Sequence, residues 1–198
     1  MVKPPRVFLA ALLCAAAVQT LLAVDVKVDF DKSFSFAGLR TWAWNADQKG
    51  HIMLARSPED DPDLVRSRAE PIIKRVLTEE LAKRGLTEAP AGSAPDLVAN
   101  YYLLITYGTS AQYIGQFVPP IWGLPYIPAS TQSLTIKEEG ALVIDFGSPG
   151  RDNGKEQVVW RGIARAELKP GQTQEKRAQI LEQAIRDTLK KFPQINKK

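Results

Sequence analysis

The chain is poor in the side chains on which most enzymatic and metal chemistry depends. It has one cysteine, Cys14, one histidine, His51, and two methionines among 198 residues. A zinc site needs several cysteine or histidine ligands, so a single histidine beside Gly50 is better explained as a solvent-exposed loop residue. Nucleophile-elbow serines, phosphate-binding loops and zinc-binding helix motifs are all missing. We therefore expect no enzyme activity, no metal and no cofactor.

The acidic residues do not supply a site either. One cluster consists of Glu59, Asp60, Asp61 and Asp63. It lacks the alternating ligands, the turn glycine and the closing glutamate of a calcium-binding loop. Acids at the start of a helix interact favourably with its dipole, which explains their position. Asp145 and Arg161 lie on neighbouring predicted strands, where we expect a structural cross-strand pair rather than a catalytic one.

Acidic residues are absent from the first 24 positions, and this region has the features of a secretory signal peptide. Lys3 and Arg6 precede an unbroken apolar run over residues 7–17, and small residues follow. The basic end stays on the cytoplasmic side while the apolar run enters the translocon. We predict that residues 1–23 are a signal peptide that is cleaved after Ala23, with Ala15 to Ala17 as the second choice.

Two alternatives to cleavage are open. Residues 7–24 hold only Gln19 and Thr20 as polar members, which makes them just long enough for an uncleaved membrane anchor. A lipid anchor on Cys14 usually requires small residues before the cysteine, but Leu12 and Leu13 stand there. We therefore expect no lipidation, and the predicted location is the periplasm or cell envelope.

Cleavage would also change what the composition allows. The mature chain would contain no cysteine, which excludes disulfides and thiol catalysis. It would keep 24 basic residues against 22 acidic ones, without a basic patch interleaved with aromatic residues. The sequence therefore gives no support for nucleic acid binding.

Hydrophobic periodicity predicts a single α+β domain over residues 24–198. Alternating or continuous apolar runs predict strands at 24–31, 41–44, 96–107, 140–146 and 157–168, and helical spacing predicts helices at 63–84 and 173–192. Residues 45–61 and 147–154 are expected to form a loop and a turn-rich connection. The predicted fold is an antiparallel sheet of about five strands with two helices packed on one face, in the order β-β-α-β-(loop)-β-β-α.

Three elements carry more specific expectations. Both alternating sets of residues 96–107 are largely apolar, so this strand should be covered on both sides along part of its length. Pro71 should either kink the first helix or mark where its regular part begins. In the last helix, Leu181, Ile185 and Leu189 belong to an apolar stripe that should face the sheet.

The order of these segments resembles an uncharacterised bacterial family of exported α+β domains, a domain-of-unknown-function group common in envelope proteins and lipoproteins. The resemblance covers nearly the whole mature chain and rests on residues 28–31, 41–44, 80–86, 95–101, 140–145, 159–162 and 192–193. It implies the fold and the compartment, and it supplies no catalytic residues. Members are often anchored through a lipidated cysteine, from which the context of Cys14 departs.

One long loop, residues 108–133, stands out by its composition. Its central part carries no charge, and four prolines punctuate it: Pro119, Pro120, Pro125 and Pro128. Such a segment either folds back over a sheet face or presents an apolar patch to a protein or lipid partner. The candidate contact residues for an envelope protein or a lipid surface are Tyr113, Phe117, Ile121, Trp122, Leu124 and Tyr126.

The sequence thus favours an exported, non-enzymatic binding or assembly domain that acts through this apolar Pro-rich loop. A hydrolase or other enzyme with an unrecognised site would instead need clustered ionisable groups with perturbed pKa values. The third interpretation is a purely structural envelope protein. The ligand, the partner and the oligomeric state do not follow from the sequence.

Overall fold

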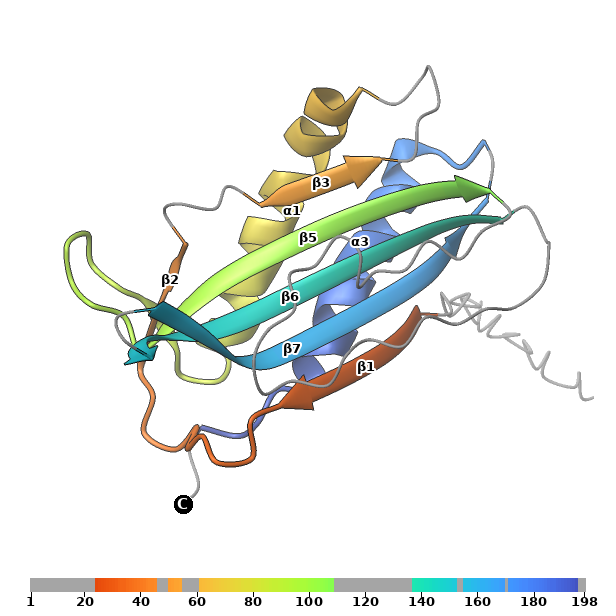
Figure 1. Ribbon diagram of the computed structural model, residues 1–198. Helices are drawn as coiled ribbons and strands as arrows, with labels where there is room; N and C mark the ends of the chain where they lie inside the picture. The colour runs from red at the N-terminus through yellow and green to blue at the C-terminus, as the bar shows by residue number, and fades with distance from the viewer. Residues whose placement is uncertain are drawn as a thin grey trace, which may run out of the picture.

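A computed structural model of the chain describes residues 24–45, 50–54, 61–108, 137–152, 155–169 and 171–195. Strands of this part form one sheet in the order β1-β7-β6-β5-β2-β4, and β3 pairs with β5 (Figure 1). The strands are β1 Val24–Phe30, β2 Thr41–Trp44, β3 His51–Leu54, β4 Thr87–Glu88, β5 Leu97–Gly108, β6 Lys137–Asp152 and β7 Lys155–Leu168. The helices are α1 Pro62–Ala82 and α3 Gln174–Lys190.

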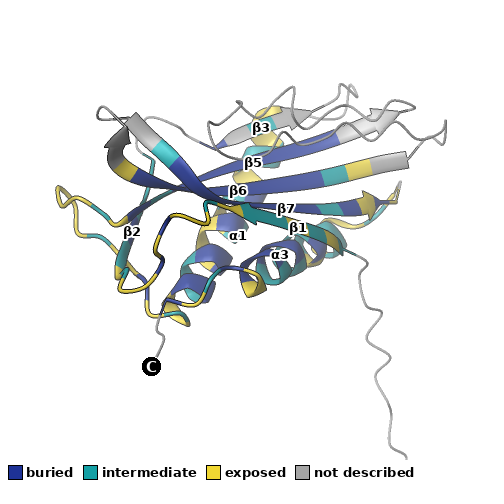
Figure 2. Cartoon of the chain, turned by 60° about the horizontal axis from the view of Figure 1, so that its bottom comes forward, coloured by how far each residue is buried: buried dark blue, intermediate teal, exposed yellow. Residues whose placement is uncertain are grey.

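The sheet is mixed, with an antiparallel centre. The strands β1, β7, β6 and β5 pair antiparallel, whereas β2 and β3 run parallel to β5 and occupy successive stretches of its edge. Both helices pack against one face of the sheet (Figure 2). The predicted α+β class, the element order and the one-sided helix layer are therefore confirmed, and two short parallel strands, β3 and β4, are added to them.

Two predicted boundaries are wrong. Residues 45–61 were expected to form a loop, but residues 51–54 form β3, because the edge of β5 beyond β2 offers free hydrogen-bonding groups. The turn-rich residues 147–152 belong to β6, and the register slips between Phe146 and Gly147 and again between Ser148 and Asp152. Such bulges bend a strand locally and accommodate Gly and Pro within it.

The first helix runs unbroken through its proline. It begins at Pro62, with Asp61 as the N-cap whose side chain accepts a hydrogen bond from the backbone N–H of Asp63. The alternative that the regular helix starts near Pro71 is therefore wrong. None of the described helices is both long enough and apolar enough to span a membrane.

The two helices lie parallel, and polar contacts join their C-terminal halves. Arg186 of α3 reaches Glu79 at 3.1 Å and Glu80 at 2.6 Å on α1. One turn further on, the Arg84 guanidinium donates to the backbone oxygen of Leu189 at 2.6 Å. Arg75 of α1 also pairs with Glu182 near the middle of α3. The pocket described below lies between the opposite, N-terminal halves of the helices.

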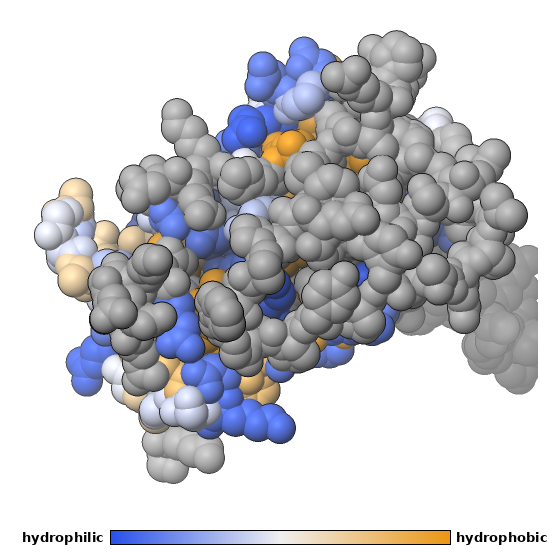
Figure 3. Space-filling view, viewed as in Figure 1, coloured by the Kyte–Doolittle hydropathy of each residue, from blue (hydrophilic) through white to orange (hydrophobic). Residues whose placement is uncertain are grey.

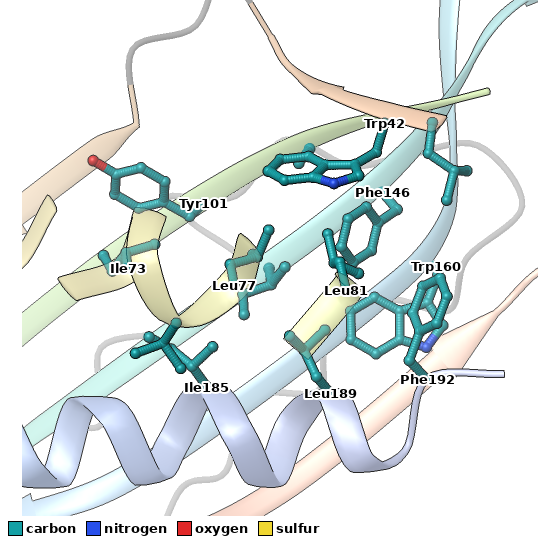
Figure 4. Packing of buried hydrophobic residues seen from close by; sticks show 14 of the residues in the cluster. Trp42, Ile73, Leu77, Leu81, Tyr101, Phe146, Trp160, Ile185, Leu189 and Phe192 are labelled. Carbon is teal, nitrogen blue, oxygen red and sulfur yellow. The ribbon is translucent and has the colours of Figure 1, made fainter. Parts of the chain in front are cut away.

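Aromatic residues fill the core beneath this joined end. The Phe192 ring lies 5.0 Å from that of Phe146 and 5.1 Å from that of Trp160, and Trp42 is fully buried nearby (Figure 4). Gly162 lets α3 approach β7 closely, because any side chain there would collide with Thr188 and Trp160. The core therefore combines large aromatic groups with one close backbone contact.

Candidate functional site

The face of the sheet opposite the helices is also buried. Side chains on a strand alternate between faces, and residues from both faces of β5, from Tyr101 to Leu104, are at most 7% exposed. The prediction that this strand is covered on both sides is confirmed. The helix-free face carries an apolar cluster of its own: Tyr102, Leu104, Ala141, Val143 and Ile163.

A buried ion pair lies on this helix-free face. Asp145 of β6 and Arg161 of β7 are register partners, and the guanidinium donates from Nε to Oδ1 and from NH2 to Oδ2, both at 2.7 Å. The two residues are 1% and 6% exposed. The expected cross-strand pair is present, but it is buried, which the sequence did not indicate.

The environment of this pair argues for a structural role. Burial raises the pKa of the Asp145 carboxyl above its ordinary value, while the hydrogen bonds and charge of Arg161 oppose that rise. One guanidinium occupies both carboxylate oxygens. Neither residue is therefore free to bind a substrate or to transfer a proton. No group of three histidine, cysteine, aspartate or glutamate side chains in the described part of the chain could hold a metal ion.

The connection between β5 and β6 is far longer than the fold requires. Gly108 pairs with Lys137 in the antiparallel register, so the two strand ends are already neighbours. Two to five residues are enough to join such strands in a hairpin. The residues 109–136 between them are therefore an insertion whose length must have another reason.

All six candidate contact residues fall in that insertion, outside the residues that the structure describes. They are Tyr113, Phe117, Ile121, Trp122, Leu124 and Tyr126. His51, by contrast, begins β3 and pairs with Tyr102 of β5. The loop position expected for this histidine is therefore wrong. Figure 3 views the molecule from its helix-free side. The described residues that are visible there are mostly hydrophilic, with small hydrophobic areas between them.

A pocket of about 660 Å³ opens between the N-terminal halves of α1 and α3, on the helix side of the sheet. Small residues make its floor, among them Gly140, Ala164 and Ala166. On the same strands, Phe146 and Trp160 fill the equivalent space at the other end of the sheet. The pocket therefore coincides with a fall in side-chain volume along β6 and β7, and it lies beyond the ion pairs of Glu79, Glu80 and Glu182 that join the helices.

Polar groups gather around this apolar interior. Arg68 and Arg177 line the pocket together with the acids Asp61 and Glu175. Asp61 is engaged as the cap of α1, and the backbone and Thr173 hydrogen bonds that Glu175 makes in the first turn of α3 lower its pKa. Sequence reasoning missed this site because its residues come from five segments and are individually ordinary.

The chain matches a family in sequence over most of its length. The profile of DUF4136, a domain of unknown function, matches residues 26–194. No protein of curated function matches the chain.

Two solved structures with a TM-score above 0.5 share the fold at low identity, and a third is similar at a lower score. A DUF4136 family protein (BT2437) from Bacteroides thetaiotaomicron VPI-5482 has a TM-score of 0.52 and 18% identity over 88% of this chain and 98% of that one. A PDZ domain protein from Parabacteroides distasonis has a TM-score of 0.51 and 15% identity over 88% of this chain and 37% of that one. The PelC dodecamer from Paraburkholderia phytofirmans has a TM-score of 0.41 and 10% identity over 88% of this chain and all of that one.

Proposed function

The chain belongs to the DUF4136 family, a domain of unknown function, and from that premise we propose that it is an exported, non-enzymatic binding or assembly domain of the periplasm or cell envelope. Its contact surface is the apolar Pro-rich loop 108–133, and its partner is an envelope protein or a lipid surface. The signal-peptide features of residues 1–23 support the compartment.

The length of the β5–β6 connection is the observation that carries this proposal. Gly108 and Lys137 pair directly, so an insertion of uncharged and aromatic residues between them serves no purpose in closing the hairpin. Tyrosine and tryptophan combine a large apolar ring with a polar tip, which suits them to interfaces and membrane surfaces. Prolines restrict the backbone and so lower the entropy lost when such a loop is ordered against a partner.

A non-catalytic role agrees with the chemistry of the described residues. Their most deeply buried charged groups, Asp145 and Arg161, are occupied with each other. The other carboxylates with shifted pKa values form ion pairs with basic side chains or accept hydrogen bonds from backbone N–H groups. Asp96 is an example, because hydrogen bonds from the backbone N–H groups of Arg40 and Thr41 lower its pKa.

Removing two aromatic side chains from the loop tests this proposal. We expect the combined Trp122→Ala and Tyr126→Ala variant to co-sediment less with envelope membranes, because both proposed anchors are lost. Its melting temperature should change by less than about 2 °C, since the proposed contacts are with a partner and not with the core.

The matched control changes two polar residues of the same loop, Thr131→Ala with Gln132→Ala, and should leave both measurements unchanged. A large fall in melting temperature with unchanged co-sedimentation would show that the aromatic residues belong to the fold. The binding proposal would then be abandoned.

A further inference from the structure

We propose that the pocket between α1 and α3 binds a single-chain amphiphile with an anionic head, the apolar tail lying on the small-residue floor and the head at the mouth. The inference rests on residues that the structure describes, and it does not depend on the role proposed for the loop 108–133. Ligand sites of this kind are typically concave and mostly apolar, with a few polar groups that fix orientation, and enclose roughly 300–1,000 Å³.

The shape and lining of the pocket favour an apolar tail as the buried part of the ligand. Its floor carries Gly140, Ala164 and Ala166, and the facing helices contribute further small residues, Ala69 and Ala178. Protein interiors are normally close-packed, so an opening of this size among apolar side chains loses contacts unless something occupies it. Leu64 at the pocket lining is 43% exposed, although it is a large apolar residue on a helix that packs against the sheet.

The charges around the mouth of the pocket favour an anionic head group. Because the helices are parallel, both N-termini lie at the open end, and each carries a partial positive charge that favours an anion. Arg68 is exposed at the lining and forms no ion pair with another residue that the structure describes. The pocket lining also carries two acids, and both have hydrogen-bond partners within the protein: Asp61 accepts the backbone N–H of Asp63 at 2.9 Å, and Glu175 makes hydrogen bonds with the backbone and Thr173 in the first turn of α3.

Gln172 offers a hydrogen-bond acceptor at the pocket. The side-chain oxygen of Gln172, which lines the pocket, is buried and has no hydrogen-bond partner among the described residues. Buried polar atoms are rarely left in this state. A water held beside the head group, or a hydroxyl on the ligand, would satisfy it.

Calorimetric titration of the exported protein with octanoate, decanoate and dodecanoate, each below its micellar concentration, tests the inference. We expect saturable binding of one molecule, with affinity rising roughly fourfold for each added methylene group that is buried. Dodecyltrimethylammonium should bind at least tenfold more weakly than dodecanoate, because its head is cationic.

Two variants, each with a matched control, locate the ligand in the pocket. Ala178→Phe fills the pocket from α3 and should reduce dodecanoate affinity at least tenfold, whereas Ala82→Phe, at an exposed position near the end of α1, should not change it. Arg68→Gln should weaken dodecanoate but not octyl glucoside, whose head is neutral. Lys32→Gln removes the same charge beyond the far end of β1 and serves as its control.

Each part of the proposal has its own contradicting result. Absent or non-saturable binding, or equal effects of Ala178→Phe and Ala82→Phe, would overturn the proposed pocket ligand. Equal affinity for the anionic and cationic detergents would overturn the assignment of the head. If Ala178→Phe fails to fold, unchanged dodecanoate binding by the Ala166→Leu variant would contradict the proposed tail position.

Discussion

Replacing Asp145 with leucine should lower the free energy of unfolding by about 3–5 kcal/mol, because it leaves the Arg161 guanidinium buried without its counter-charge. Asp145 is 1% exposed, and its two oxygens take both hydrogen bonds from Arg161 at 2.7 Å. Arg161→Met should cost less than Asp145→Leu, since burial already raises the pKa of Asp145 and the carboxyl can accept a proton. Urea unfolding of each variant gives the values.

The double variant tests whether the loss comes from the unpaired charge. Asp145→Leu combined with Arg161→Met removes both charges and should lie within about 1 kcal/mol of the unmodified protein, or above it, because a buried ion pair contributes little net stability. The exposed Lys74–Glu70 pair is the control, and Lys74→Ala should cost less than about 0.5 kcal/mol. Single-variant losses near that size would mean that water reaches the helix-free face in solution.

Replacing Ile185 with alanine should cost about 2–5 kcal/mol, because a fully buried side chain leaves a cavity that its neighbours fill only in part. Ile185 points from α3 into the core beside Ile73 and Leu77 (Figure 4). Its exposed fraction is zero, as is that of Leu189 one turn further on. Denaturant unfolding of the variant measures the loss.

The control for this face of α3 is Lys190→Ala. Lys190 is exposed, and its ion pair within the described residues is with Asp187 on its own helix, so the loss should stay below about 0.5 kcal/mol. Similar losses for the two variants would contradict the orientation of α3 in the structure.

Sequence patterns predict the elements whose environment is local. The alternation along residues 24–31 gives β1 with half-buried valines and exposed Asp25 and Lys27. The two apolar sets of β5 correctly predict burial of both its faces. The last helix is also as expected, since Ile185 and Leu189 face the sheet, whereas Leu181 is only half-buried and lines the pocket.

Features that depend on distant segments were not predictable. The strand β3 has only four residues, and it forms because β2 leaves part of the edge of β5 unpaired. Burial of the Asp145–Arg161 pair depends on what surrounds the helix-free face, which residue types alone do not reveal. The pocket needs two helices about a hundred residues apart in sequence to lie parallel and to separate over Ala164 and Ala166.

Export underlies the proposed function, and the intact mass of the protein recovered from the envelope fraction of its own bacterium tests it most directly. We expect the mass of residues 24–198, because the basic start and short apolar run of residues 1–17 have the features of a cleavable signal peptide. A full-length mass would contradict cleavage and support a retained membrane anchor. A diacylglycerol adduct on Cys14 would contradict the expectation that the chain is not lipidated, and recovery only from the cytoplasm would contradict the account as a whole.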